Sequence, residues 1–345
     1  MVDEVYANQP LHNALRIYFL TADERAVFHA LPSHVAAQIG HSHRATLETL
    51  VEAMFNGDTT LNWELECPHC HGITAIGNIF YLTPHDFECP ACKGQFIVHT
   101  DHEAQVSFSP HPTLRTLFRA TDDAEYKAAI RRHHPPTTVH ELMTIQRFRE
   151  WAQNEPLPPN EYLEVQQTTL WFSDLTGSTA LYARNGDPFA YRLVREHFDL
   201  VTESIQRASG AVVKTIGDGV MAVFTAGQHA LQAALDANAR LRQFNVENEL
   251  RDDCRLRLKI GINTGPVLAV TLNDRLDYFG TTVNIASRVS NMAEGEEIIL
   301  SGDTYATLAV QQLAEPYKLT TCSADVRGLD HPIAVYRLRQ YVSTD

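Results

Sequence analysis

Apolar residues recur at helical spacing in several stretches of the first half of the chain. Residues 1–60 are expected to be mostly helical, and the clearest helical stretch is 44–55, which an Asn-Gly pair ends. Residues 61–110 contain short apolar runs, which predict short strands. Residues 138–152 are predicted to form another helix, because a Thr and a Glu at its start have the spacing of a capping box. This half is therefore predicted to be a mixed α/β region.

A different pattern begins at Thr168, after three prolines within residues 156–159 interrupt the chain. The expected elements are a buried strand ending at Asp174, a helix over 178–208, a hairpin over 211–224, a helix over 226–248, and strands over 256–262 and 267–272 hinged at Gly265-Pro266. This β-α-β-β-α-β order is typical of a ferredoxin-like sheet covered by helices on one face. The fold class predicted for this half is therefore α+β.

One further predicted helix combines an apolar stripe with a pair of polar side chains. The stripe recurs at intervals of three and four and consists of Val283, Ala286, Val289 and Ala293. Asn284 and Arg288 lie one helical turn apart, so they project from one face of the same helix. The polar pair is therefore predicted to stand opposite the packed face.

The length of 345 residues predicts about two domains, which we place at residues 1–155 and 166–345 with a proline-rich linker over 156–165. The hydrophobic content of 44% is ordinary for a globular protein. The net charge of −14 argues against binding to nucleic acid, which needs a basic face. Neither a signal-peptide pattern nor an apolar stretch of ~18 residues is visible, so we expect a cytoplasmic protein that is not bound to a membrane.

Four of the six cysteines form two C-x-x-C pairs, namely Cys67 with Cys70 and Cys89 with Cys92. In a cytosolic chain such pairs indicate a metal site more often than disulfides. The spacing is that of a zinc ribbon, here over residues 61–100, and predicts one structural Zn²⁺ per chain. A rubredoxin-like iron site uses the same four ligands. In either case four thiolates complete a tetrahedron and leave no open position for catalysis.

Two aspartates stand where strands end or turn. Asp174 closes a predicted strand, and Asp218 lies in the turn of the predicted hairpin between Gly217 and Gly219. Carboxylates at adjacent strand ends can bind Mg²⁺, which completes its coordination with water and phosphate oxygens. Each aspartate alone is more simply explained as a turn residue, but the flanking glycines allow a ligand to approach the backbone closely.

The segments around these residues and the helix pair resemble the catalytic motifs of class III nucleotidyl cyclases, which make cyclic nucleotides from nucleoside triphosphates. The resemblance covers residues ~165–340 and rests on residues 172–179, 213–222 and 277–288. It implies that Asp174 and Asp218, with the backbone carbonyl of Leu175, hold two Mg²⁺ or Mn²⁺ ions per active site. It further implies that Lys214 and Asp277 bind the adenine edge and that Asn284 and Arg288 orient the ribose and stabilise the transition state. Arg327 falls where the family has a basic residue for the terminal phosphates.

The resemblance therefore implies an adenylate cyclase that acts on ATP for cyclic-nucleotide signalling. Adenine offers an amine donor and a ring-nitrogen acceptor, which are complementary to Asp277 and Lys214 respectively. Guanylate-type members have Glu and a small polar residue at these two positions. Ser178 stands where many members have Phe, a departure that many bacterial members share.

The resemblance also implies a head-to-tail homodimer, in which the metal aspartates of one protomer face the base-binding and catalytic residues of the other. The N-terminal half resembles a domain fused to bacterial cyclases, and its position predicts a regulatory role with an unidentified ligand or protein partner. Two alternatives stay open, namely a cyclase that acts on GTP or a pyrimidine triphosphate, and a non-catalytic scaffold with the cyclase fold.

Overall fold

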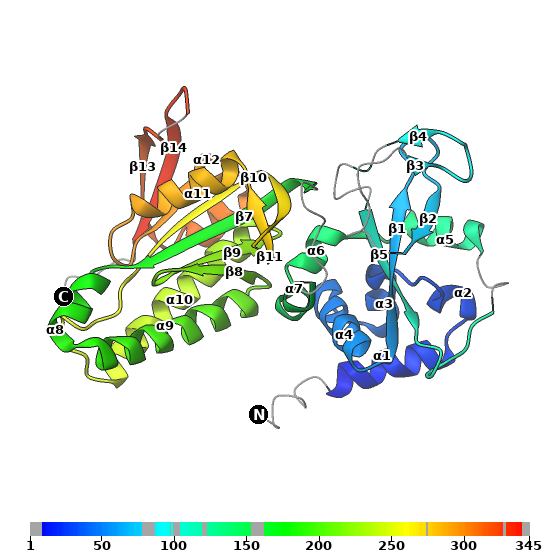
Figure 1. Ribbon diagram of the computed structural model, residues 1–345, viewed down its shortest axis with the longest axis horizontal. Helices are drawn as coiled ribbons and strands as arrows, with labels where there is room; N and C mark the ends of the chain where they lie inside the picture. Colours follow the sequence, from blue (N-terminus) through cyan, green and yellow to red (C-terminus); the bar gives the residue numbers. More distant parts are fainter. Residues whose placement is uncertain are drawn as a thin grey trace. The chain divides into compact units, whose positions relative to one another are not determined.

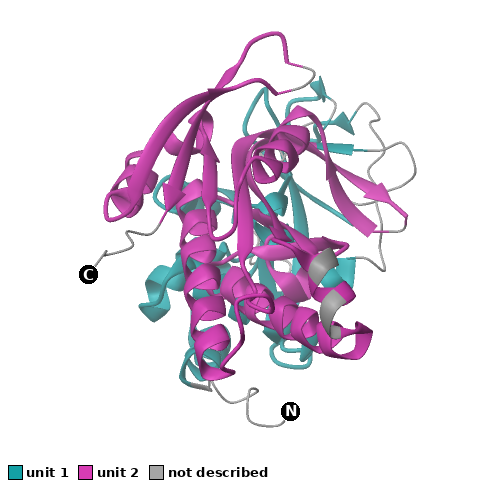
Figure 2. Ribbon diagram, turned by 90° about the vertical axis from the view of Figure 1, so that its left-hand side faces the viewer, with its two compact units in different colours: residues 1–143, 150–163 teal, residues 144–149, 164–345 magenta. Residues whose placement is uncertain are grey.

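The computed structural model describes residues 9–77, 87–96, 98, 104–118, 123–152, 162–273, 275–326 and 329–339. The chain divides into two compact units, shown in Figure 2. Unit 1 comprises residues 1–143 and 150–163, and unit 2 comprises residues 144–149 and 164–345. The predicted boundaries and domain roles stay predictions, and residues 156–161 of the predicted linker lie outside the described residues. In the described part of the chain, every helix is too short or too polar to cross a membrane.

Unit 1 combines helices with two small sheets, as labelled in Figure 1. Its helices are α1 (Gln9–Thr21), α2 (Glu24–Val27), α3 (Pro32–Ile39), α4 (His43–Phe55), α5 (Ala124–Arg131) and α6 (Val139–Met143). A four-stranded sheet has the order β2-β1-β5-β6 and consists of β1 (Thr59–Glu66), β2 (Ile73–Ile76), β5 (Ala104–Pro110) and β6 (Thr137–Thr138). A separate hairpin consists of β3 (Phe87–Glu88) and β4 (Gln95–Phe96). The expected mixture of helices and short strands is confirmed.

The helix ends predicted from capping residues and the Asn-Gly pair agree with the structure in part. Helix α4 is confirmed: the Ser42 hydroxyl accepts the Ala45 N–H at its start, and Gly57 with a φ of 77° follows its end. The capping box is confirmed too, because Thr138 and Glu141 exchange hydrogen bonds of 3.0 and 3.2 Å. The single helix predicted after it is wrong. The first helix, α6, ends at Met143, and a second helix, α7 (Gln146–Ala152), begins three residues later. Between them lie Thr144 and Ile145, two buried residues with branched Cβ atoms.

Unit 2 is built on a twisted sheet whose described strands have the order β13-β14-β12-β10-β7-β9-β8, with β11 paired to β10. The strands are β7 (Tyr162–Leu175), β8 (Ala211–Ile216), β9 (Gly219–Phe224), β10 (Leu258–Leu272), β11 (Arg275–Phe279), β12 (Ile298–Ser301), β13 (Lys318–Ala324) and β14 (Ile333–Arg339). The helices are α8 (Ser178–Asn185), α9 (Asp187–Arg207), α10 (Gly227–Glu247), α11 (Thr281–Asn291), α12 (Gly302–Tyr305) and α13 (Leu308–Ala314). Strands β10-β7-β9-β8 are the fourth, first, third and second of the predicted motif, so the ferredoxin-like α+β fold is confirmed.

The two faces of this sheet are covered by different helices. Helices α9 and α10 lie side by side in Figure 1 and share the main core with Trp171 and Ile260 of the sheet. Successive strand residues point to opposite faces, and in β12 Ile298 belongs to this core whereas Ile299 packs with Val289 of α11. Helix α11 therefore lies on the face opposite α9 and α10. The expectation that helices cover one face holds for the two helices of the motif and is wrong for α11.

Two further predictions are corrected. The helix expected over 178–208 is broken at Gly186, whose φ of 80° is left-handed, and α9 restarts with a proline in its first turn. The strands expected on either side of Gly265-Pro266 are one strand, β10. Strand β12 pairs with residues 260–262 of β10 and β11 with residues 268–272. Pro266 lies between these two pairings, so its missing N–H interrupts neither.

Candidate functional site

The two predicted metal-binding carboxylates come from neighbouring strands at the centre of the sheet. Ser173 of β7 is paired with Val220 of β9 in antiparallel register, so Asp174 lies opposite Gly219, the residue after Asp218. A Cβ atom at Gly219 would lie 2.2 Å from the Ser173 carbonyl oxygen, far inside contact distance. Only glycine permits this approach, and the approach brings the two aspartates to the same end of the strand pair.

The environments of these two carboxylates differ. Asp174 pairs with Lys259 of β10, with 2.6 Å between Oδ2 and Nζ. The Oδ2 atom of Asp218 is buried and has no hydrogen-bond partner among the described residues. A buried carboxylate oxygen without a donor is costly, and a bound cation is one way to satisfy it. The donor set therefore fits hard divalent cations such as Mg²⁺.

His197 of α9 forms a hydrogen bond to the hairpin turn that holds Asp218. The imidazole is fully buried, and its Nε2–H donates to the Asp218 carbonyl oxygen over 3.1 Å. Burial lowers the pKa of His197 to about 4. The ring is therefore neutral near pH 7, and the hydrogen bond requires the proton on Nε2.

Lys214 and Asp277, predicted to bind one base, are in direct contact. The Lys214 ammonium donates to Oδ2 of Asp277, and Oδ1 of the same carboxylate accepts the Tyr278 N–H over 2.8 Å. The side chain of Asp277 is 8% exposed and that of Lys214 is 38% exposed. The lysine comes from β8 and the aspartate from β11, so the contact joins two strands that are far apart in the sequence.

Helix α11 presents Asn284 and Arg288 as expected, one turn apart and away from its buried stripe. The Arg288 guanidinium has no ion-pair or hydrogen-bond partner within the described ranges. Glycines on β10 allow the helix to lie close to the sheet, because a Cβ at Gly261 would lie 2.2 Å from the Ser290 nitrogen. Val283 is only half-buried, so the predicted stripe is narrower at its start.

Two further predicted site residues are Leu175 and Arg327. Leu175 is the last residue of β7, and Arg327 lies outside the described residues.

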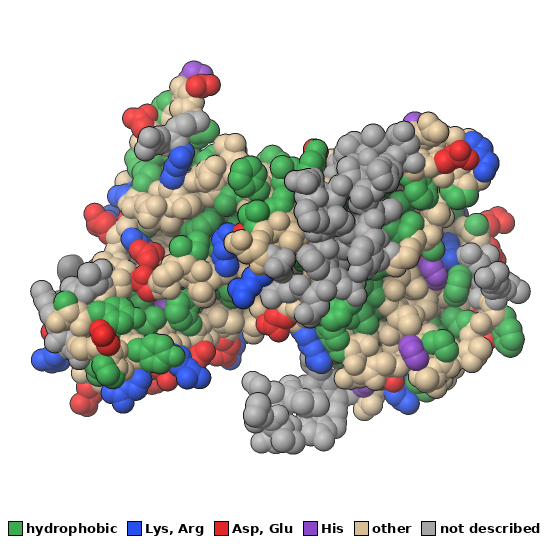
Figure 3. Space-filling model, in the orientation of Figure 1, with side chains coloured by type: hydrophobic (Ala, Val, Ile, Leu, Met, Phe, Trp, Pro, Cys, Tyr) green, Lys and Arg blue, Asp and Glu red, His purple; other side chains and the backbone are tan. Residues whose placement is uncertain are grey.

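Large apolar side chains are exposed at the ends of β8 and β11, which hold Lys214 and Asp277, and at the end of β10, which pairs with β11. Ile216 of β8 is 50% exposed, Leu272 of β10 45% and Phe279 of β11 61%. An open groove of about 200 Å³ next to Phe279 is lined by residues 164–166 of β7 and by residues 266–268 of β10. Figure 3 shows hydrophobic side chains at the surface over β10, and basic and acidic side chains interspersed elsewhere on that face of unit 2.

In unit 1 the four cysteines of the two pairs converge. Their sulfur atoms all lie within 4.8 Å of one another, and Cys67–Cys92 and Cys70–Cys89 are each separated by 3.7 Å. Both pairs have the same turn: the first cysteine N–H donates over 2.9 Å to the carbonyl of a glycine five residues on, Gly72 or Gly94. Sulfur atoms bound tetrahedrally to Zn²⁺ at ~2.3 Å stand ~3.8 Å apart, so this donor set fits zinc.

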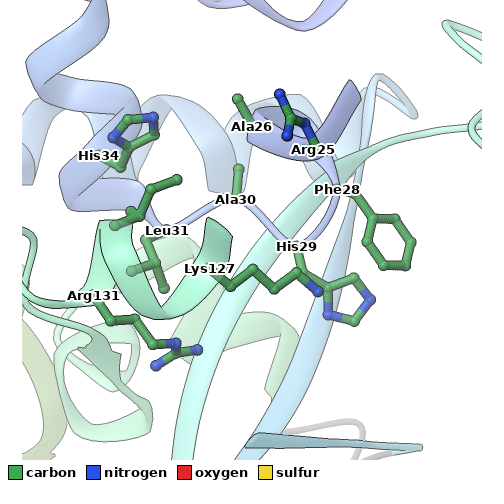
Figure 4. Close-up of a pocket in the computed structure, with 10 residues that line it drawn as sticks. Arg25, Ala26, Phe28, His29, Ala30, Leu31, His34, Lys127 and Arg131 are labelled. Carbon is green, nitrogen blue, oxygen red and sulfur yellow. The ribbon is translucent and has the colours of Figure 1, made fainter. Parts of the chain in front are cut away.

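A separate polar cluster in unit 1 surrounds Glu64, whose side chain is 3% exposed. Arg131 forms an ion pair with it, His29 forms a hydrogen bond with it over 2.7 Å, and the Ser107 hydroxyl donates to it over 2.6 Å. Burial opposes ionisation of Glu64, yet these contacts hold the pKa of the carboxyl below its usual value. Figure 4 shows the adjacent pocket, which Arg25, His29, Lys127 and Arg131 line. The other two basic residues of the pocket also have partners, because Arg25 binds Asp23 and Lys127 lies over the ring of Phe28.

Residues 161–339, just over half of the chain, match the family model described as the adenylate and guanylate cyclase catalytic domain. The chain belongs to this cyclase family. Its unit 2 therefore contains a nucleotidyl cyclase catalytic domain, a class that uses divalent metal ions.

The relatives of this cyclase domain include both purine specificities. A receptor-type adenylate cyclase of Trypanosoma congolense is 27% identical over 216 residues, which cover 52% of this chain and 28% of that protein. Guanylate cyclase 2G of Rattus norvegicus is 30% identical over 172 residues, which cover 47% of this chain and 16% of that protein. The match thus spans less than a third of either relative. A solved adenylyl cyclase of P. aeruginosa is 21% identical with a TM-score of 0.47 and covers 52% of this chain and 97% of that one.

Sequence reasoning missed Lys259 and His197 in this cyclase domain. Alternation along β10 assigns Lys259 to the face opposite Leu258 and Ile260, but nothing in the sequence pairs it with Asp174. His197 falls on the apolar stripe of α9 together with Val194 and Val201. In the sequence it is therefore indistinguishable from an ordinary core histidine.

Proposed function

We propose that this protein is an adenylate cyclase that converts ATP to 3′,5′-cyclic AMP and pyrophosphate. The observation that carries the proposal is the Lys214–Asp277 contact, which places a partly exposed donor beside a buried acceptor. Asp277 accepts from the exocyclic amine of adenine and Lys214 donates to the neighbouring ring nitrogen. Guanine has a carbonyl and an N–H at these places. Its carbonyl would face the Asp277 carboxylate, acceptor against acceptor, and its N–H would face the Lys214 ammonium, donor against donor. A site with such buried polar groups discriminates strongly against the wrong base.

The family includes GTP-specific members, so a guanylate cyclase is the main alternative. The rat relative is a guanylate cyclase at an identity close to that of the trypanosomal adenylate cyclase. Pyrimidine triphosphates and a purely structural role of the cyclase fold are further alternatives. The Lys214–Asp277 pair favours adenine over guanine and uracil, whose edges present a carbonyl and an N–H at these places. Among the described residues, the unpartnered Asp218 oxygen and Arg288 guanidinium favour a working site over a scaffold.

Asp174, Asp218 and the Leu175 carbonyl would hold the two Mg²⁺ or Mn²⁺ ions. When bound, these ions supply the charge that acidifies the 3′-hydroxyl and neutralises the pyrophosphate leaving group. Asn284 orients the ribose, and Arg288 adds positive charge at the α-phosphate, where negative charge develops. Lys259 already lies beside Asp174, so the same strand end offers a cation to the phosphate chain. The basic residue proposed for the terminal phosphates is Arg327.

We further propose that two protomers share each active site. Lys214 and Asp277 meet within one chain, whereas Asn284 and Arg288 project from α11 without partners for their side chains among the described residues. The apolar side chains Ile216, Leu272 and Phe279 are exposed near the base-binding pair, where a second copy would cover them. In a head-to-tail homodimer, these surfaces face the metal carboxylates of the other protomer.

For unit 1 we propose one structural Zn²⁺ per chain, held by Cys67, Cys70, Cys89 and Cys92. The repeated turn supports this proposal. The backbone N–H groups of Cys92 and Ala91 donate hydrogen bonds to the Cys89 sulfur and lower the pKa of its thiol to about 6. A thiolate is the form that binds metal. The regulatory role of this unit stays a proposal based on its position in the chain.

The first prediction concerns the metal carboxylates. Asp174→Asn and Asp218→Asn each remove a ligand charge without a change of shape, so each should lower turnover at least ~1,000-fold at unchanged thermal stability. Rates are measured with purified protein, ATP and saturating Mg²⁺ or Mn²⁺. Asp303→Asn, at an exposed position in the first turn of α12, is the matched control and should retain full activity. A near-normal rate in either site variant would refute the metal assignment.

The second prediction concerns the shared site. Asp174→Asn and Arg288→Ala proteins should each be inactive but regain activity when mixed, because half of the sites in mixed dimers contain every residue. A mixture of Asp174→Asn with Asp218→Asn is the control and should stay inactive, since both defects lie on the same side of the interface. Absence of recovery in the first mixture, with subunit exchange verified by a tag, would mean that each protomer holds a complete site.

The third prediction concerns base specificity. Lys214→Glu with Asp277→Cys presents an acceptor where guanine has donors, so the ratio of kcat/KM for ATP to that for GTP should fall at least ~10-fold, from about 1–3 kcal/mol per mispaired hydrogen bond. Arg275→Ala, two residues before Asp277 on the same strand, is the control. A wild-type protein that prefers GTP, or an unchanged ratio in the double variant, contradicts the proposed reading of the base.

The fourth prediction concerns zinc. Metal analysis of the purified protein should find about one zinc atom per chain, and Cys89→Ser should lose it and unfold the cysteine module, because zinc binding and folding are coupled. Cys322→Ser changes a thiol of unit 2 and should leave the zinc content unaltered. If the native protein contains iron, the rubredoxin-like alternative is correct. If it contains neither metal and all four thiols react freely, the site is not a metal site.

A further inference from the structure

The segment that precedes the cyclase domain contacts both strands that hold the proposed base-binding pair. Residues 144–149 belong to unit 2, although residues 150–163 after them belong to unit 1. Gln146 and Arg149 lie three residues apart on α7 and therefore share one face of that helix. One of them binds β8 and the other binds β11, the two strands that the Lys214–Asp277 contact joins.

Gln146 holds β8 at an irregular point. Strand β8 is the last strand on its side of the described sheet, and its pairing with β9 shifts by one residue between Val212 and Lys214. Such a bulge leaves a backbone group without a strand partner and changes the direction of the next side chains. The Gln146 side-chain oxygen accepts the Val212 N–H over 2.8 Å at this bulge. The orientation of Lys214 therefore depends on a side chain from outside the sheet.

Arg149 holds β11 on both sides of Asp277. Among the described strands β11 pairs with β10 alone, so its outer edge needs other partners. The Arg149 guanidinium donates to the carbonyl oxygen of Leu276, and it lies over the ring of Tyr278 at 5.3 Å from the ring centre. These two residues are the neighbours of Asp277 in the chain. A displacement of Arg149 would thus move the backbone that carries the base-binding carboxylate.

The burial of Arg149 is costly, which argues for a role beyond packing. The residue is 1% exposed, and its Nε and Nη1 atoms have no hydrogen-bond partner among the described residues. A buried cation needs compensation, and here a single carbonyl and an aromatic ring provide it. A Met or Leu would fill such a position at lower cost but would leave the Leu276 carbonyl without this donor.

We propose that Gln146 and Arg149, which we call the α7 clip, are positioning residues that set the geometry of Lys214 and Asp277 and so determine base selectivity. The inference rests on the proposed role of that pair in binding the base. The clip acts through strands β8 and β11 and touches neither the nucleotide nor the metal ions. Loss of the clip therefore affects discrimination between bases and leaves the metal dependence of the reaction unchanged.

The test uses the full-length protein and two pairs of variants. Gln146→Met and Arg149→Met remove the hydrogen bonds at similar side-chain length, whereas Gln146→Glu keeps an acceptor for the Val212 N–H. Arg147→Met is the matched control, because Arg147 is an exposed arginine on the same helix. For each protein, kcat/KM is measured with ATP and with GTP, together with the Mn²⁺ concentration that gives half-maximal rate.

Both clip variants should lower the ATP-to-GTP ratio of kcat/KM about fivefold or more, as the loss of one buried hydrogen bond predicts. Gln146→Glu and Arg147→Met should stay within about twofold of wild type, and the Mn²⁺ requirement should be constant. A purely structural role would reduce both activities equally and leave the ratio unchanged, which would overturn the proposal. If Arg149→Met does not fold, the Gln146 pair decides alone.

The design separates failure of the clip from failure of the proposed function. A wild type that prefers GTP refutes the adenylate cyclase assignment, yet the clip variants must still shift its base ratio. In an Asp277→Asn background, Arg149→Met should no longer shift the ratio, because the two residues act through one contact. Additive effects of the two substitutions on the ratio would show that Arg149 acts elsewhere.

Discussion

The close contact between β7 and β9 at Gly219 is the constraint on which the site depends. The Ser173 carbonyl oxygen occupies the place that a Cβ atom of residue 219 would need, at 2.2 Å. Any other residue would separate the two strands at the point where Asp174 leaves one of them and Asp218 precedes the other. The convergence of the carboxylates is thus a property of the strand pairing, and the buried imidazole of His197 fixes the turn that completes it. The proposed metal site therefore stands on the central strands of the sheet.

The base-binding pair has a different foundation, because it joins the edges of the sheet. Strand β8 ends the described sheet on one side and β11 pairs with β10 alone, so both strands have backbone groups without strand partners. Edge strands are the least constrained part of a sheet. Lys214 and Asp277 connect these two edges directly, and α7 connects them a second time through Gln146 and Arg149. In the proposed site, base selection would therefore depend on edge strands that a segment outside the sheet contacts, whereas metal binding would depend on the central strands.

Sequence patterns predicted the parts of this structure that local chemistry determines. The capping box at Thr138, the hairpin turn at Gly217 and the cysteine turns follow from a few neighbouring residues, and all lie where they were expected. Errors arose where distant parts of the chain decide the outcome. Pro266 looks like a strand end, but it falls between two strand pairings of β10 and the strand continues through it. Lys259, His197 and Arg149 have no local signal, because each acquires its role from a partner at least 20 residues away.

Both proposed ligand sites are closed by lysines in the free protein. Lys259 neutralises Asp174, and Lys214 neutralises Asp277. Both ion pairs are partly exposed, and such pairs contribute only about 0–1 kcal/mol net, so a ligand can displace either lysine at little cost. In the proposed site, a metal ion would take the place of the lysine at Asp174 and an adenine amine would take its place at Asp277. Each ammonium would then be available to an acceptor on the nucleotide. On this proposal, a chain of net charge −14 can bind a triphosphate because the ligand itself makes these two cations available at the site.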